Sequence, residues 1–189
     1  MRKIILTLVA VFTAISGLSA QTPFGHYLSS YNGISYPLSA SIENEEKVMY
    51  VQILGSTPDE LILFRVRGEE SILAFNNALR ECQKVYEQRL ADKELKKKDY
   101  NETLDIVFPL VDICFYRNDV WCFAFEKNLK PELVNSYGTL HFFLSSGAYD
   151  NVSKETTSGS LVFKAKRDFK YYFKAIDRNM EKAFSKLAI

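Results

Sequence analysis

Two histidines are the only imidazole side chains that could serve as a general base in this chain of 189 residues. His26 lies in a Tyr-rich N-terminal stretch, and His141 lies in a segment of alternating apolar residues. Neither has two carboxylates or thiols beside it at the spacing of metal ligands, so we expect no metal site. The chain also lacks the G-x-S-x-G and H-E-x-x-H motifs and any glycine-rich phosphate-binding loop. The sequence therefore indicates no cofactor and identifies no catalytic residue.

Three cysteines could form a disulfide if the chain is exported to an oxidising compartment. Cys114 and Cys122 belong to two adjacent predicted strands, whose apolar residues we expect to share one core face; these are Ile113, Phe115, Trp121, Phe123 and Phe125. That shared face requires a three-residue loop at 117–119, which places Cys114 opposite Cys122. The sequence predicts either a Cys114–Cys122 bridge or two free thiols. Cys82 lies on the core stripe of a predicted helix, and we expect it to be a free buried thiol.

The last predicted helix, at about residues 167–187, carries most of its positive charge on one side. Arg167, Lys170, Lys174, Arg178, Lys182 and Lys186 span an arc of about 160° at 100° per residue. Residues 164–186 contain eight basic side chains against three acidic ones. Such a face is typical of binding to an anionic partner, such as lipid headgroups, an acidic glycan or an acidic protein surface, or else of an ordinary solvated helix. The candidate binding residues are Arg167, Lys170, Lys174 and Arg178.

The sheet face turned away from the helices supplies two further candidate binding residues, Tyr116 and His141. Alternation turns them outward together with several apolar side chains, which leaves this face too apolar for open solvent. We therefore expect the Tyr-rich N-terminal stretch or a partner to cover it. A thiolate–histidine pair between His141 and one of the two strand cysteines is an alternative use of this histidine, and a solvent-exposed strand histidine is the simpler interpretation.

The first twenty residues have the layout of a cleavable signal peptide. Arg2 and Lys3 give a positive start, residues 4–18 carry no charge, and Ser19 and Ala20 are small residues suited to cleavage before the next residue. The apolar run would be only about 22 Å long as a helix, shorter than the ~30 Å hydrocarbon core of a bilayer. The sequence therefore predicts a secreted or periplasmic protein, cleaved near Ala20, with no transmembrane segment afterwards.

The chain beyond residue 20 has the length of a single domain and almost no net charge. The 24 basic residues fall to 22 without Arg2 and Lys3, against 23 acidic residues. A net charge of −1 gives no indication of a nucleic-acid partner.

Apolar periodicity predicts an α+β fold, with residues 1–20 as the signal peptide, 21–37 as an irregular Tyr-rich arm and 38–189 as a single α+β domain. The segments with a clear period are strands near 34–42, 49–53 and 62–67, a helix at 69–95, strands near 104–108, 113–115, 121–125, 140–144 and 161–165, and the last helix. Residues 145–160 are polar and rich in Gly and Ser, which is typical of a surface loop. We expect one mostly antiparallel, twisted sheet of about six to eight strands with two amphipathic helices packed on one face.

These features favour a non-catalytic binding or interaction module of the cell envelope or extracellular space. Its partner would be a protein, a glycan or an envelope component. The alternative is a small secreted hydrolase, whose site would be formed by the N-terminal arm and the 145–160 loop with His26 or His141 as general base. Oligomerisation through the apolar sheet face is a third possibility.

Overall fold

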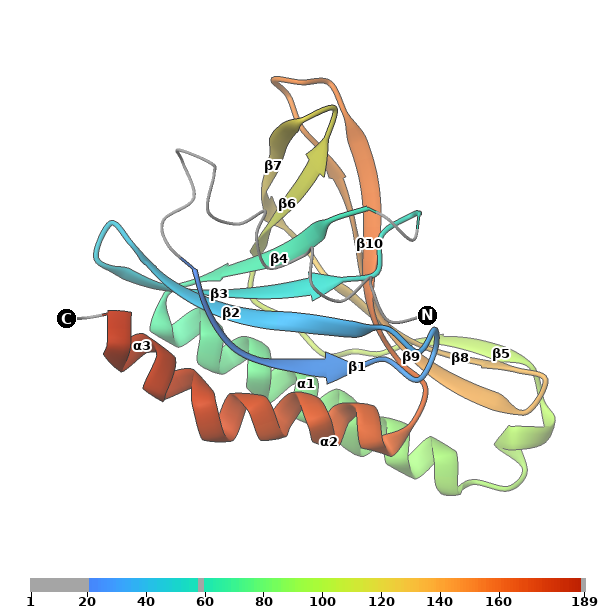
Figure 1. The fold of residues 1–189 in the computed structure, drawn as a ribbon. Helices are drawn as coiled ribbons and strands as arrows, with labels where there is room; N and C mark the ends of the chain where they lie inside the picture. Colours follow the sequence, from blue (N-terminus) through green and yellow to red (C-terminus); the bar gives the residue numbers. More distant parts are fainter. Residues whose placement is uncertain (1–20, 58–59, 188–189) are drawn as a thin grey trace, which may run out of the picture.

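The structure is a computed structural model, and it describes residues 21–57 and 60–187. The predicted signal peptide lies outside the described residues. The strands are β1 (Thr22–Leu28), β2 (Ser35–Glu43), β3 (Glu46–Ile53), β4 (Ile62–Arg67), β5 (Tyr100–Thr103), β6 (Val111–Arg117), β7 (Val120–Lys127), β8 (Lys130–Ser136), β9 (Thr139–Tyr149) and β10 (Thr156–Phe163). The helical elements are α1 (Glu69–Ala91), the 3₁₀ turn η2 (Leu95–Lys97), α2 (Lys166–Ala175), the π-helical turn η3 (Ile176–Met180) and α3 (Glu181–Leu187). This order confirms the α+β class (Figure 1).

The strands form two antiparallel sheets, so the expectation of a single sheet is wrong. The larger sheet has the order β1-β2-β3-β4-β6-β7, and the smaller one has the order β10-β9-β8-β5. They meet where Leu54, after β3, forms an isolated bridge with Ser160 of β10. Gly159 permits this approach, because a Cβ there would lie 2.7 Å from the Cδ1 of Ile53 and 2.8 Å from that of Ile62. Strand alternation alone does not reveal which strands leave one sheet for another, and this is why the sequence predicts too few sheets.

Both helical segments pack on one face of the six-stranded sheet, as the sequence predicts (Figure 1). α1 contacts β3 and β4, and the α2–α3 segment contacts β1 and β2. The apolar stripe of α1, with Phe75, Leu79 and Cys82 at its centre, is buried in the main core. α1 ends at Ala91 rather than at 95, because the carboxylate of Asp92 accepts hydrogen bonds from the backbone N–H groups that follow it.

The segment expected to be an irregular arm, residues 21–37, is instead β1, a turn and the beginning of β2. Tyr27 is fully buried and stacks on Tyr36, with their ring centroids 5.3 Å apart. A register shift between Pro23 and Gly25 interrupts the alternation of β1, which hides the strand from a search for a period of two. The backbone at Gly25 also lies directly against α2, since a Cβ there would be 2.6 Å from the Cβ of Ala175.

The predicted surface loop at 145–160 is also mostly strand. β9 extends to Tyr149 and β10 begins at Thr156, so only residues 150–155 form the connecting turn. The polar residues of this hairpin pair across the strands, as Ser145 and Ser160 do through their hydroxyls at 2.8 Å. Two further differences concern single strands. The sequence does not predict β8. The strand expected near 104–108 is absent, and β5 lies just before it, at Tyr100–Thr103.

The register of the β6–β7 hairpin differs from the expected one by one residue. A two-residue turn, Asn118-Asp119, has positive φ values of 53° and 62°, and it pairs Phe115 with Cys122 and Cys114 with Phe123. Cys122 therefore lies in the main core, whereas Cys114 lies on the opposite face of the sheet in a small cluster with Val48, Tyr50 and Leu63. Because side chains on opposite faces of one sheet cannot meet, the predicted bridge between Cys114 and Cys122 is wrong. The prediction that Cys82 is a buried free thiol is confirmed.

We expect all three cysteines to be free thiols that resist alkylation in the native protein. Burial raises the pKa of Cys82 to about 12 and places that of Cys114 well above its usual value, so little reactive thiolate is present at neutral pH. Intact-mass measurement after iodoacetamide treatment without reductant should show no adduct on the folded protein and three adducts after denaturation. A Cys114–Cys122 linked peptide would contradict the strand register.

Candidate functional site

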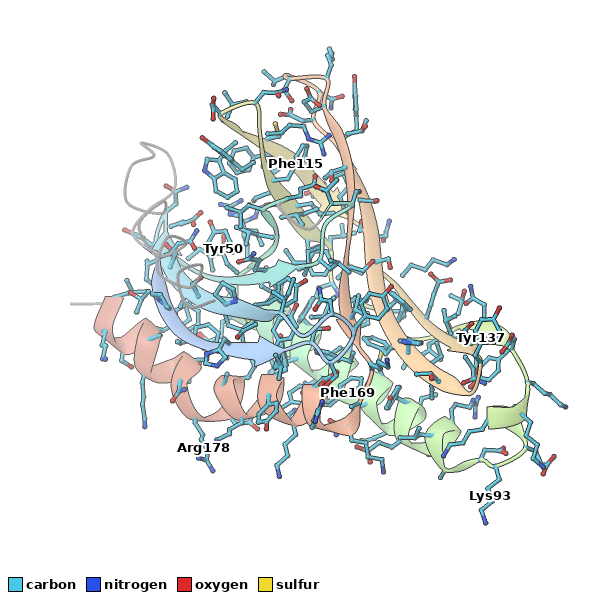
Figure 2. All side chains as sticks on the ribbon, turned by 45° about the vertical axis from the view of Figure 1, so that its right-hand side comes forward. Tyr50, Lys93, Phe115, Tyr137, Phe169 and Arg178 are labelled. Carbon is cyan, nitrogen blue, oxygen red and sulfur yellow. The ribbon has the colours of Figure 1, made fainter. Side chains whose placement is uncertain are left out.

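The basic residues predicted from the sequence lie on one continuous helical segment, formed by α2, η3 and α3. We call six of them the basic row: Arg167, Lys170, Lys174, Arg178, Lys182 and Lys186. All six are exposed. The opposite side of the segment buries Phe169, Tyr172 and Phe184 against the sheets. Figure 2 shows this division, with Phe169 turned toward the strands and Arg178 turned into solvent.

The first turn of α2 is fixed by the buried carboxylate of Asp168. It accepts hydrogen bonds from the backbone N–H groups of Lys164 (2.9 Å) and Ala165 (3.2 Å), which precede the helix. It also accepts hydrogen bonds from the backbone N–H (3.1 Å) and the hydroxyl of Ser30, in the turn between β1 and β2. The Nε of Arg167 donates to the same hydroxyl at 2.9 Å. The basic row therefore begins at a position held by the residues just before α2 and by the distant turn between β1 and β2.

None of the three acidic residues in the C-terminal helical segment neutralises the basic row. Asp168 is buried in the cap, and Asp177 forms an ion pair with Arg80 of α1. Glu181 lies 3.5 Å from the ammonium group of Lys47 on β3. Within the part of the chain that the structure describes, no carboxylate lies within ion-pair distance of any of the six cations. The described carboxylates thus leave the positive charge of the row unpaired.

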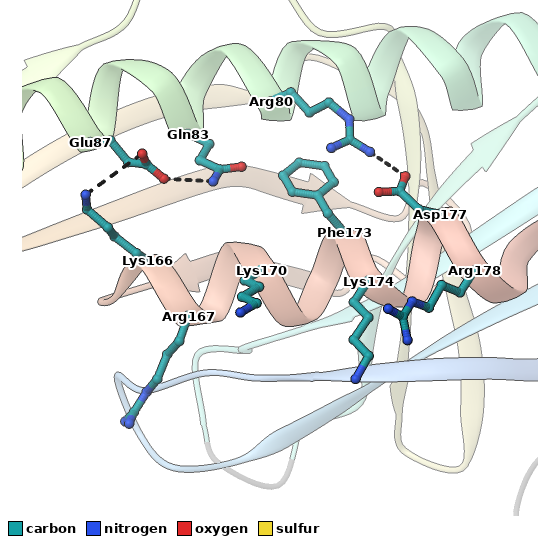
Figure 3. A pocket seen from close by; sticks show the side chains of 10 residues that line it. All are labelled: Arg80, Gln83, Glu87, Lys166, Arg167, Lys170, Phe173, Lys174, Asp177 and Arg178. Atoms are coloured by element: carbon teal, nitrogen blue, oxygen red, sulfur yellow. Dashed lines mark hydrogen bonds and ion pairs between the residues drawn. The ribbon is translucent and has the colours of Figure 1, made fainter.

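A cleft of about 600 Å³ runs between α1 and the basic row. The guanidinium of Arg80 lies 4.0 Å above the ring of Phe173, in a cation–π contact. Lys166 lies 3.9 Å from Glu87, which also accepts a hydrogen bond from Gln83. Figure 3 shows that these side chains fill the side of the cleft facing α1, whereas Arg167, Lys174 and Arg178 point away from α1. The two acids of the cleft lining are paired with Arg80 and Lys166, and the other cations that line it, Arg167, Lys170, Lys174 and Arg178, belong to the basic row.

The other two predicted binding residues lie on strands and not on this helical segment. Tyr116, near the end of β6, packs on Trp121 with ring centroids 5.5 Å apart. His141 lies on β9 of the smaller sheet and contacts the rings of Tyr31 (5.6 Å) and Phe143 (6.1 Å). His26 is exposed on β1. The structure therefore unites Arg167, Lys170, Lys174 and Arg178 on one helical segment, whereas Tyr116 and His141 lie on strands of two different sheets.

The face of the large sheet opposite the helices holds a polar cluster that sequence reasoning did not anticipate. Asp112 is buried and pairs with Arg65 (2.7 Å) and Arg67 (2.9 Å). Arg65 also pairs with Glu43, which accepts a hydrogen bond from the hydroxyl of Tyr50. Because every carboxylate here has a cationic partner, we assign this cluster to stabilisation of the sheet face. The sequence signal available for this cluster was that Arg65 and Arg67 are two residues apart, which places both on one face of a strand.

Comparison of the chain with protein-family models, with curated proteins and with solved structures gave no match. Among residues 21–57 and 60–187, no helix is long and apolar enough to cross a membrane. No group of three or more His, Cys, Asp or Glu side chains in the same described part of the chain is placed to hold a metal ion. The geometry and charge of the surfaces described above are thus the observations that bear on function.

Replacing Asp168 with Ala is expected to lower the free energy of unfolding by about 2–3 kcal/mol, because four donors lose a buried acceptor. Urea denaturation followed by circular dichroism measures this change. Asp177→Ala is the matched control on the same helical segment, and removal of its exposed ion pair should cost less than about 1 kcal/mol. Equal losses in the two variants would contradict the assigned role of Asp168.

His141 is expected to titrate below the usual histidine range. Burial lowers the pKa of its imidazole, and the positive charge of Lys164 lowers it further. Hydrogen bonds with the backbone of Val134 and Thr139 raise the pKa, but by a smaller amount. Because the pKa is lower in the folded state than in the unfolded state, this group should reduce stability as the pH falls below about 6.5. NMR titration of the imidazole protons measures the pKa, and His141→Gln should remove this part of the acid sensitivity. Titration at or above the usual value would contradict the expectation.

Proposed function

We propose that this protein is an exported, non-catalytic binding module that holds an anionic partner on the basic row. The single observation that carries the proposal is that, among residues 21–57 and 60–187, no carboxylate pairs with any of the six exposed cations, while all three acids of the same helical segment are engaged elsewhere. A solvated helix face of ordinary composition usually intersperses both signs of charge. A one-signed ridge instead raises the local concentration of anions.

The position of the row supports binding by a preformed surface. Its helical segment is packed against the large sheet, and its N-terminal turn is fixed by Asp168. The side chains are free to adapt, but the backbone that presents them need not reorganise when a partner binds. Fixing the backbone in advance reduces the entropy lost on association.

Export supports the same proposal through the kind of partner available. The positive start, uncharged run and small residues of the first twenty positions predict passage to the envelope or the extracellular space. Acidic glycans and anionic lipid headgroups are abundant ligands in those compartments. The hydrolase alternative relied on an irregular arm and a 145–160 loop, and both segments are mainly strands in the structure.

Retention on a resin of immobilised dextran sulfate tests the proposal. The unmodified protein should bind in low salt and elute as salt rises, since screening over about 10 Å at 0.1 M weakens exposed charge contacts. The triple variant Lys170→Glu, Lys174→Glu, Arg178→Glu should pass through unretained, because it reverses the middle of the row.

The matched control is Lys93→Glu, Lys96→Glu, Lys98→Glu, which makes the same change in net charge at exposed lysines beyond α1. This control should retain most of its binding, whereas equal loss in both triple variants would show that net charge and not the basic row determines retention. Failure of the unmodified protein to bind any polyanion in low salt would overturn the proposed function.

A further inference from the structure

The helical segment that carries the basic row contains a π-helical turn at its centre. α2 ends at Ala175, the π turn η3 covers Ile176–Met180, and α3 follows without a break. A π turn closes its hydrogen bonds over five residues instead of four, and such turns are often found at functional sites. Arg178 lies within this turn, which separates the first three cations of the row from the last two.

The π turn brings the six cations closer to one line. In an uninterrupted α-helix they would spread over about 160°, with Lys182 and Lys186 at the far side of the arc. Each residue of a π turn advances by only about 80°, so residues beyond five such positions lag by roughly 90°. Lys182 and Lys186 then fall into the same sector as Lys170 and Lys174, and the whole row occupies an arc of about 70°.

The aligned row has the dimensions of a track for an extended chain. Successive cations are three or four residues apart, which corresponds to about 4.5–6 Å along the helix axis, and the row from Arg167 to Lys186 is about 28 Å long. The acids Glu87 and Asp177 line the cleft on the α1 side of the row. These acids are paired with Arg80 and Lys166, so the cations without a carboxylate partner among the described residues are confined to one line, which a single narrow polymer can follow.

An exposed aromatic side chain borders the row. Tyr171 is 45% exposed, and its position on α2 is about 40° from Arg167 around the helix axis and four residues away. The flat face of a tyrosine provides an apolar surface for the C–H groups of a sugar ring, while the neighbouring cations hold charged substituents. A ligand that matches both features would carry regularly spaced negative charges on a chain of sugar rings, which describes an acidic polysaccharide.

We propose that the partner of the basic row is a linear acidic polysaccharide with one carboxylate or sulfate on each sugar or disaccharide unit. This inference rests on the proposed function and specifies its ligand. Binding is electrostatic along the whole row, with Tyr171 packing against one sugar ring. Polyphosphate and anionic lipid vesicles offer negative charge without sugar rings, and vesicles also offer it as a surface and not as a line.

Oligogalacturonates of increasing length are the probes, with affinity measured by isothermal titration calorimetry at low and moderate salt. Affinity should rise steeply until the oligomer spans about 28 Å, and only slowly beyond that length.

The alignment by the π turn is tested by two double variants. The variant Lys182→Glu, Lys186→Glu should reduce affinity at least tenfold, within about threefold of the effect of the variant Lys170→Glu, Lys174→Glu. Lys93→Glu, Lys96→Glu is the control double variant and should change affinity less than about threefold. If the Lys182 and Lys186 pair matters no more than this control, the alignment by the π turn is wrong.

Tyr171→Ala separates a glycan from other anions. Because Tyr171 is exposed, its removal should leave the fold intact while reducing affinity for the oligogalacturonates about fivefold, with no effect on binding of polyphosphate. Tighter binding to polyphosphate or to phosphatidylglycerol vesicles than to long oligogalacturonates would overturn the polysaccharide inference and leave the proposed function standing. Binding to none of the three would overturn both.

Discussion

The buried carboxylate of Asp168 is the contact on which the position of the basic row depends. Its four hydrogen bonds join the end of β10, the first turn of α2 and the turn between β1 and β2. Around it, the rings of Tyr27, Phe163, Phe169 and Tyr172 pack edge-on or tilted against one another. An unpaired carboxylate at this depth would be very costly, so the three segments must come together for the fold to be stable. The start of the helix that carries the row is consequently fixed to both of these segments.

Contacts that join the helices to their neighbours also take up the acids of the C-terminal helical segment, so that no described carboxylate pairs with the basic row. Asp177 reaches α1 to pair with Arg80, whose guanidinium covers Phe173, and Glu181 reaches Lys47 on β3. Each contact uses one acid of the C-terminal helical segment to join it to a neighbouring element. Exposed ion pairs of this kind contribute little stability individually. Their larger effect is on the distribution of charge, because an acid that pairs with a neighbouring element is not available to neutralise a cation of the basic row.

The sequence predicts well those elements whose residues follow a regular period. The helix beginning at Glu69, the last helical segment and the strands β2, β3 and β4 all have uninterrupted apolar periodicity, and the structure contains each of them. Prediction fails where the period is broken or masked. A register shift at Gly25 hides β1, the serines of the β9–β10 hairpin resemble a loop, and the two-residue turn at Asn118 reverses the faces of β7. In β7 the small Cys122 and Ala124 face the core, and the large Trp121 and Phe123 do not, so side-chain size is misleading there.

The sequence by itself determined the α+β class, the two amphipathic helices and the basic side of the last one, because these follow from local periodicity and from charges carried on a single element. Only the tertiary structure decided that there are two sheets, that Cys114 and Cys122 lie on opposite faces, and that no carboxylate of the described residues pairs with the basic row. These outcomes depend on pairing between segments far apart in the chain, such as Ser30 with Asp168 or Arg80 with Asp177. A linear pattern records which charges an element carries, but their neutralisation depends on which distant side chains the fold brings within reach.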